Sequence, residues 1–234
     1  MGILSLTSHE YWATVSGGSL KSLENQEEAL AQWGVTAIEF RADLIPFDVF
    51  EKLITRNKWR VPTFVAHFGI GANAKHAEKA ILKAITADIH GCICHSRSEI
   101  LYDLQQACIS AGKSFAAAYH SQTPMTLDEA LQEFDTQEAL NPLFRKIAVR
   151  ALRFEDALAI IEATQRASAQ GKTPTVGAIF GSHRWARIVL PHVGSAITFI
   201  IAHKVFNEEG GDDEQLQISE VDNLQKFRLL PVNA

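Results

Sequence analysis

The sequence has few cysteines, no excess of positive charge and no long apolar run, and each absence excludes a class of protein. Its three cysteines, Cys92, Cys94 and Cys108, are too few for a disulfide framework and predict a reducing compartment. The formal net charge of −5 gives no sign of a nucleic-acid or membrane-surface partner. Residues 188–202 form the most apolar segment, which is too short and too interrupted to span a membrane. Because residues 1–10 also lack a signal-peptide pattern, we expect a cytoplasmic protein.

Apolar runs typical of strands alternate with helical patterns through the whole chain. Strands are predicted at residues 11–16, 35–44, 61–68, 87–94, 113–120, 146–151, 173–180 and 195–202. Helices are predicted at residues 20–33, 47–54, 75–84, 98–111, 126–136, 155–169, 184–189 and 220–229. Eight such units in 234 residues predict one α/β domain over residues 1–234, a (β/α)8 TIM barrel. A doubly wound sheet is the alternative, but the turn at residues 16–19 lacks its G-x-G-x-x-G motif.

A lysine lies inside the sixth predicted strand. Because strand side chains alternate, Lys146, Ala148 and Arg150 share one face. Such a lysine is either a salt-bridged structural residue or a desolvated amine with a lowered pKa, able to attack a carbonyl. His120 ends the preceding strand, after alanines at 116–118 that leave room beside it. Although a lone histidine is more often structural, this pair has the parts for imine chemistry with proton transfer.

Charged side chains gather on two further segments. Glu39, Arg41 and Asp43 alternate along the second strand and share a face, where they either bind a polar ligand or form a structural ion network. Arg184 and Arg187 follow the seventh strand, and one of them could bind a substrate carboxylate through both of its terminal nitrogens.

Together these stretches resemble type I 3-dehydroquinate dehydratase over nearly the whole chain. The matching pieces are Glu39-x-Arg41-x-Asp43-Leu44, Ala118-Tyr119-His120 with Thr123-Pro124, Lys146-Ile147-Ala148-Val149, residues 187–199 and Gln217-Ile218-Ser219. The resemblance implies a (β/α)8 barrel, usually a homodimer, that uses neither metal nor cofactor. It also implies the substrate, 3-dehydroquinate, a cyclic hydroxy-keto carboxylate that the family converts to 3-dehydroshikimate in the shikimate pathway.

The resemblance also implies roles for single residues. Lys146 would form a Schiff base with the substrate ketone, and His120 would act as general acid and base in a syn elimination. Arg187, favoured over Arg184 by its spacing to the following proline, would bind the carboxylate. Glu39 and Arg41 would orient ring hydroxyls. Gln217 would belong to a loop that closes over the substrate.

The chain departs from the family in several places, one of which is a longer segment between Gly177 and Arg187. The family's arginine and glutamate after the third strand are missing from residues 66–73, where His67 is the only polar substitute nearby. The acidic residues of the family's fourth strand are replaced by the run of residues 91–95, GCICH. Gln215-Leu216 replaces a Pro-Gly pair before Gln217. Three interpretations stay open: a dehydratase with an altered pocket, a Schiff-base enzyme for a related ketone, and a non-catalytic sensor of pathway intermediates.

Other patterns carry weaker expectations. Cys92-x-Cys94-His95 could be part of a zinc site, but buried structural cysteine is the better interpretation. Gly69-x-Gly71 with Asn73 could hold an anion or simply allow a tight turn. The acidic, glycine-bearing residues 208–214 are expected to form a solvated loop or a lid at the barrel mouth.

Overall fold

The structure, a computed structural model, describes residues 6, 8–55, 59–68, 74–201, 215–227 and 229. Within them all the strands form one parallel sheet in the order β7-β6-β5-β4-β3-β2-β1-β8-β9. The strands are β1 (Glu10–Val15), β2 (Ala37–Arg41), β3 (Thr63–His67), β4 (Gly91–His95), β5 (Ser114–Ser121), β6 (Arg145–Arg150), β7 (Thr175–Phe180), β8 (Ile197–Ile201) and β9 (Leu216–Gln217). The glycine pair at 69 and 71 with Asn73, and the acidic segment 208–214, lie outside the described residues.

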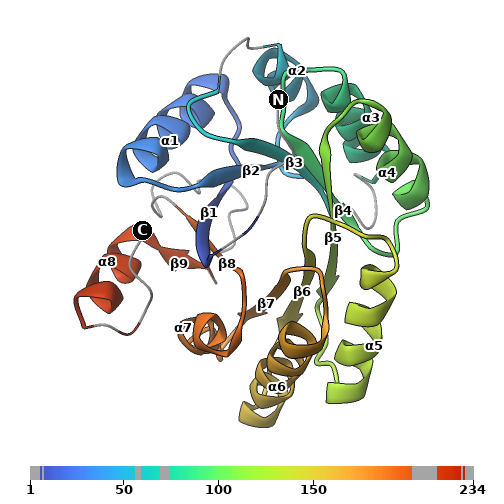
Figure 1. The fold of residues 1–234 in the computed structure, drawn as a ribbon. Coiled ribbons are helices and arrows are strands. Elements are labelled where there is room, and N and C mark those ends of the chain that lie inside the picture. The colour runs from blue at the N-terminus through green and yellow to red at the C-terminus, as the bar shows by residue number, and fades with distance from the viewer. Residues whose placement is uncertain are drawn as a thin grey trace.

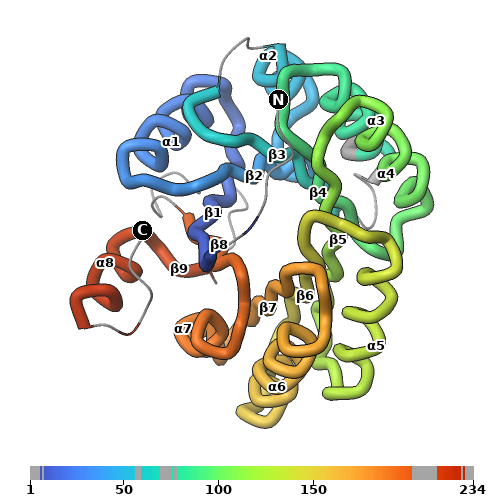
Figure 2. The backbone as a smooth tube through the Cα atoms, in the orientation of Figure 1, coloured from blue at the N-terminus to red at the C-terminus, as the bar shows by residue number. Residues whose placement is uncertain are grey.

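Helices connect the strands and cover the outside of the curled sheet (Figure 1). They are α1 (Leu20–Trp33), α2 (Phe47–Ile54), α3 (Ala74–Ile85), α4 (Leu101–Ser110), α5 (Leu127–Glu138), α6 (Phe154–Gln170), α7 (Ala186–Val189) with the 3-10 helix η1 (Leu190–Val193), and α8 (Ile218–Lys226). The tube view follows the same path, with helices outside and strands inside (Figure 2). The predicted TIM-barrel fold is confirmed. No helix of the described part is long and apolar enough to cross a membrane.

Local sequence signals set the helix ends. A capping box begins α5: the Glu129 amide donates to Thr126 Oγ1, and the Thr126 amide donates to the Glu129 carboxylate. Gly34 ends α1 with a left-handed φ of 96°, which a residue without a Cβ adopts readily. The second strand is shorter than predicted and ends at Arg41, because residues 42–45 turn toward α2; Asp43 therefore lies in that turn.

The seam of the barrel lies between β7 and β8. At the amino ends of these two strands, the Ala196 amide donates to the Thr175 carbonyl at 2.8 Å. At the other end, the strand β9, which was not predicted, pairs with the carboxyl end of β8 at Ile200↔Leu216. Because β1 occupies the other edge of β8, β9 lies on the edge that faces β7. The seam is thus narrowed at this end by a short strand that precedes α8.

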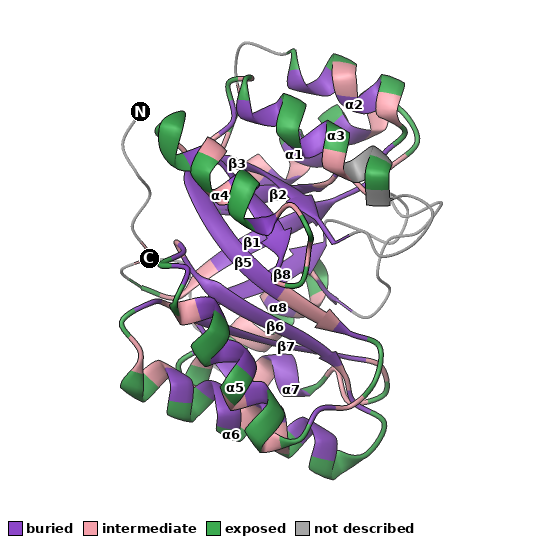
Figure 3. Cartoon of the chain, turned by 90° about the vertical axis from the view of Figure 1, so that its right-hand side faces the viewer, coloured by how far each residue is buried: buried purple, intermediate pink, exposed green. Residues whose placement is uncertain are grey.

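Aromatic side chains fill the half of the barrel interior that lies toward the amino ends of the strands. Alternation turns one face of each strand toward the helices and the other inward, so the strands are buried along their length (Figure 3). Trp12 lies with its ring centroid 4.5 Å from that of Phe64, 5.3 Å from Phe144 and 6.0 Å from Phe199. We call these four residues the aromatic floor. A Cβ at Gly91 would lie 2.5 Å from the Phe64 ring, so only glycine fits beside it.

Candidate active site

Lys146 rises from β6 directly above the aromatic floor. Its side chain is 5% exposed, and Nζ lies 3.8 Å from Glu39 Oε2 on β2. Nζ also lies 3.5 Å from the centroid of the Phe199 ring, which favours a cation–π contact. The lysine is therefore both desolvated and ion-paired, which combines the two possibilities that the sequence left open.

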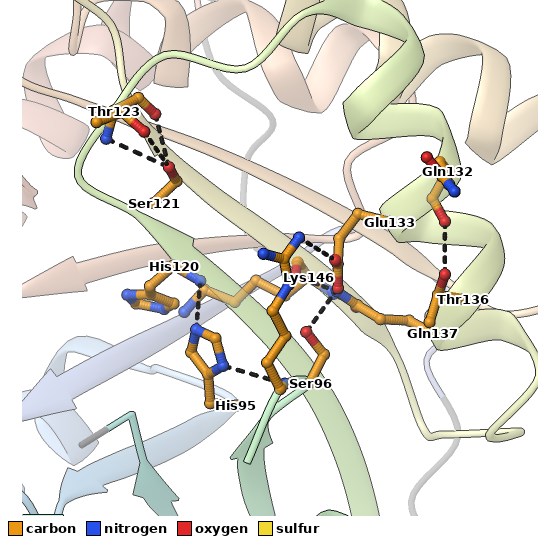
Figure 4. Close-up of polar contacts among 11 residues, drawn as sticks. His95, Ser96, His120, Ser121, Thr123, Gln132, Glu133, Thr136, Gln137 and Lys146 are labelled. Carbon is orange, nitrogen blue, oxygen red and sulfur yellow. Dashed lines mark hydrogen bonds and ion pairs between the residues drawn. The ribbon is translucent and has the colours of Figure 1, made fainter. Parts of the chain in front are cut away.

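A side chain from α5 holds the backbone of this lysine. The Gln137 carboxamide, which is fully buried, accepts from the Lys146 amide at 2.8 Å and donates to the Lys146 carbonyl at 3.1 Å (Figure 4). Gln137 Nε2 also lies 3.0 Å from Glu133 Oε1, to which it donates. The strand position of Lys146 is thus fixed by a helix as well as by its neighbouring strands.

His120 lies one layer nearer the carboxyl end of the barrel. Ala118 is opposite Lys146 in the register and His120 is opposite Ala148, and the Lys146 side chain runs toward the imidazole (Figure 4). Burial, and then the nearby positive charges of Lys146 and Arg41, lower the pKa of His120 well below its ordinary value. His120 is therefore neutral near pH 7, the form that accepts a proton.

Two rings hold His120 in place. Phe68, the residue after β3, stacks on its imidazole with ring centroids 4.1 Å apart and an interplanar angle of 20°. His95, at the end of β4, accepts from the His120 amide through Nε2 at 3.3 Å, while the Arg97 amide lies 3.1 Å from Nδ1. Burial lowers the pKa of His95, so its ring is neutral, carries one proton and accepts only one of these bonds at a time.

The charged residues of β2 and of the turn after it lie in two ion pairs. Glu39 is paired with Lys146, whereas Arg41 donates through Nε and Nη2 to the two Asp43 oxygens at 2.8 and 2.7 Å. Arg41 Cζ also lies 4.9 Å from the Phe68 ring centroid. The Glu39 carboxylate and the Arg41 guanidinium, which belong to different ion pairs, therefore line the cavity together with the lysine.

The two arginines after β7 have different surroundings. Arg187 is buried, and it donates from Nε to the Ile179 carbonyl of β7 at 2.7 Å and from Nη1 to the Phe199 carbonyl of β8 at 3.4 Å. It therefore bridges the open part of the seam. Arg184 makes a two-pronged ion pair with Glu220 of α8, at 2.7 and 3.2 Å. Of the two, Arg187 is the one beside Lys146 and His120.

These side chains enclose a cavity of about 20 Å³, which holds about one water molecule. It is lined by Glu39, Arg41, His120, Lys146, Ala148, Ala178, Phe180, Arg187, Phe199 and Gln215. A ring-sized ligand enters only when the lining moves apart. Five of the six site residues predicted from the sequence are brought together here.

The sixth predicted residue, Gln217, is not among the lining residues. It stands at the start of α8, where its amide donates to the Glu220 carboxylate at 2.9 Å. Gln215 takes a place in the lining instead, and the sequence reasoning missed it. The available signal was the departure at this point from the family's Pro-Gly pair.

Three buried side-chain atoms of the cavity lining have no hydrogen-bond partner among the residues that the structure describes. They are His120 Nε2, Gln215 Oε1 and Glu39 Oε2, of which the last faces Lys146 Nζ at 3.8 Å, an ion-pair contact that is longer than a hydrogen bond. Buried polar groups are almost always paired, so a group of three at one cavity indicates a place built for a polar ligand.

The cysteines do not build a metal centre. Cys92 and Cys94 face the helices, whereas His95, one residue further along β4, faces the other way. Burial raises the pKa of Cys94 to about 12, so the thiol stays protonated, unlike a metal-binding thiolate. In the described ranges no group of three or more His, Cys, Asp or Glu side chains could hold a metal ion.

Fold and site together define a (β/α)8 barrel enzyme with its polar residues at the carboxyl ends of the strands. Residues 97–228 match the family model described as type I 3-dehydroquinase. The chain belongs to this family of hydro-lyases, which are dehydratases of the shikimate pathway. A search of curated proteins by sequence finds no match.

Solved structures show the same fold at low identity. The type I 3-dehydroquinate dehydratase of Clostridium difficile with covalently modified comenic acid has a TM-score of 0.79 at 13% identity, covering 99% of this chain and 98% of that one. The enzyme of Geobacillus kaustophilus has a TM-score of 0.76 at 18% identity, covering 94% and 93%. The enzyme of Enterococcus faecalis has a TM-score of 0.74 at 14% identity, covering 94% of each chain. At these identities the likeness shows the fold alone.

Proposed function

We propose that the protein converts 3-dehydroquinate to 3-dehydroshikimate through a Schiff base on Lys146. The observation that carries the proposal is the placement of a buried lysine and a neutral histidine on one small cavity, with His120 Nε2 unpaired among the described residues. Family membership supports the overall reaction. The covalently modified ligand in the C. difficile structure supports a covalent route in a protein of the same fold.

The chemistry assigns one task to each partner. Lys146 Nζ attacks the ketone carbon, and loss of water gives a protonated imine that withdraws electrons from the adjacent C–H bond. His120 Nε2 takes the proton from that carbon, leaving an enamine. The enamine electrons then expel the ring hydroxyl, which leaves as water with the proton returned by His120. Water hydrolyses the remaining imine, so the net change is the loss of one water.

Charged groups around this pair would orient the substrate. Arg187 is proposed to bind the carboxylate, and Glu39 Oε2 to accept a hydrogen bond from a ring hydroxyl. Arg41, fixed by Asp43, would orient the same edge of the ring. The role of Gln217 in closing over the substrate, the homodimer and the cytoplasmic location stay predictions, and size-exclusion chromatography with light scattering would test the homodimer.

A related cyclic ketone is the second candidate substrate, and Phe68 favours it. The family has polar residues after β3, whereas here an apolar ring covers the imidazole face of His120. A substrate with fewer hydroxyls would leave fewer hydrogen bonds unmade when it lies against Phe68. Measuring imine formation on Lys146 and turnover with each of the two ketones separates the two candidates.

The test is mass spectrometry after borohydride reduction in the presence of 3-dehydroquinate. We expect a stable adduct on the peptide that contains Lys146, and absorbance of the conjugated product during turnover. Lys146→Met should lose the adduct and about 10⁴-fold or more of the turnover. The control Lys21→Met, on the exposed face of α1, should keep both. A folded wild-type protein that forms no adduct would reject the Schiff-base mechanism for this substrate.

A further inference from the structure

Gln215 is held at the cavity by two anchors. The next residue, Leu216, pairs with Ile200 of β8. Arg184 Nη1 donates to the Gln215 carbonyl at 3.3 Å, and the ion pair with Glu220 fixes Arg184 in turn. The Gln215 side chain is buried and lines the cavity. Its backbone is therefore fixed beside the carboxyl end of β8.

A hydrogen-bond chain sets which end of the Gln215 amide faces the cavity. The Thr14 hydroxyl donates its one proton to Glu39 Oε1 at 3.3 Å, because a carboxylate oxygen only accepts. Thr14 Oγ1 is then an acceptor toward Gln215, and Gln215 Nε2 donates to it at 3.2 Å. The nitrogen is thus committed to Thr14, and Oε1 is the atom turned away from it.

The two ends of this chain are both acceptors. Gln215 Oε1 and Glu39 Oε2 are buried on the same cavity, and neither accepts a hydrogen bond from the described part of the chain. Two acceptors cannot satisfy each other, so the complementary ligand group is a donor. A hydroxyl fits this place, whereas a carboxylate or a second carbonyl would be repelled.

We propose that Gln215 is a specificity-determining residue, whose Oε1 accepts a hydrogen bond from a ring hydroxyl of the substrate. The inference rests on the proposed function, and it deepens it by naming the group that is recognised. Gln215 thereby provides polar recognition in a pocket where Phe68 presents an apolar ring to the base.

The first experiment is steady-state kinetics of Gln215→Met, which keeps the side-chain length and removes the acceptor. We expect KM for 3-dehydroquinate to rise about tenfold, with kcat within about threefold, because a hydroxyl bond made in ground and transition states alike affects mainly binding. The adduct on Lys146 should still form at saturating substrate. The matched control Gln132→Met, exposed on α5, should leave KM unchanged.

A second variant covers the case in which Gln215→Met fails to fold. Thr14→Val keeps the shape of the side chain and removes the acceptor that orients the Gln215 amide. The amide is then free to turn, so KM should rise in the same direction by a smaller factor, about threefold. Circular dichroism checks the fold of both variants.

Analogues of 3-dehydroquinate that each lack one ring hydroxyl identify the recognised group. For one analogue, wild type and Gln215→Met should bind equally, because the bond is already missing from the ligand. A Gln215→Met enzyme with wild-type KM, or with the same loss for every analogue, would overturn the inference while leaving the Schiff base intact. Failure of the wild type to form an adduct or to bind 3-dehydroquinate would overturn both.

Discussion

The lower and upper halves of the barrel interior follow opposite rules. In the aromatic floor the rings pack against one another. The only polar side-chain atom of these four residues, Trp12 Nε1, donates to Glu10 Oε2 at 2.7 Å. One layer higher, the polar lining leaves His120 Nε2 and Gln215 Oε1 without a hydrogen-bond partner among the described residues. The floor is arranged for stability and the layer above it for binding a ligand, at some cost in stability.

Breaking the floor should cost the most stability. Trp12→Ala removes the ring that contacts Phe64, Phe144 and Phe199, and should lower the free energy of unfolding by about 3–5 kcal/mol. Urea unfolding measures this. The control Trp185→Ala, with 37% of its surface exposed, should cost less than about 1 kcal/mol. Equal losses of unfolding free energy in the two variants would mean that Trp12 in the aromatic floor contributes no more to stability than the more exposed Trp185.

Changing the upper layer should separate activity from stability. His120→Leu removes the proposed acid–base group, so turnover should fall by about 10²–10⁴-fold. The same change removes an unpaired buried atom, so the free energy of unfolding should be unchanged or up to about 1 kcal/mol higher. Kinetics and urea unfolding of one preparation test both, with the exposed His192→Leu as control. A large loss of stability would mean that His120 is structural.

Acidification should lower the free energy of unfolding of the protein. Burial lowers the pKa of His9, His67, His90, His95 and His120. Below pH 6.5, the ordinary pKa of histidine, the unfolded chain binds more protons than the folded one, so stability is lost as pH falls toward the folded-state pKa values. Each histidine contributes at most about 1.4 kcal/mol per pH unit. Thermal melts between pH 8 and 5 measure the slope, which should shrink in His120→Leu; a melting temperature that does not depend on pH in this range would contradict the assignment.

Strand alternation made the placement of Lys146 and His120 predictable. Lys146 and His120 were placed on inward faces of neighbouring strands by a period of two residues, a local property that the register of β5 and β6 preserves. The same rule placed Glu39 on the inward face of the second strand. The fold followed from the regular spacing of strands and helices, for the same local reason.

Other parts of the site depend on contacts that no local pattern reports. The β9 strand is two residues long and shows no periodicity, so its pairing with β8, and with it the place of Gln215, was missed. The carbonyl bonds of Arg187 across the seam arise only when β7 and β8 meet. Gln217 was assigned through a motif, and a motif does not show which neighbouring side chain turns inward.

The hydrogen bond between Thr14 and Gln215 joins residues 201 positions apart. During synthesis the ribosome has therefore made nearly all of the barrel before this wall of the pocket exists. A nascent or truncated chain that stops before β9 could acquire its lysine and histidine yet would lack the hydroxyl-accepting side. On the proposed role of Gln215, selective substrate binding is possible only after the ribosome has synthesised the chain as far as β9.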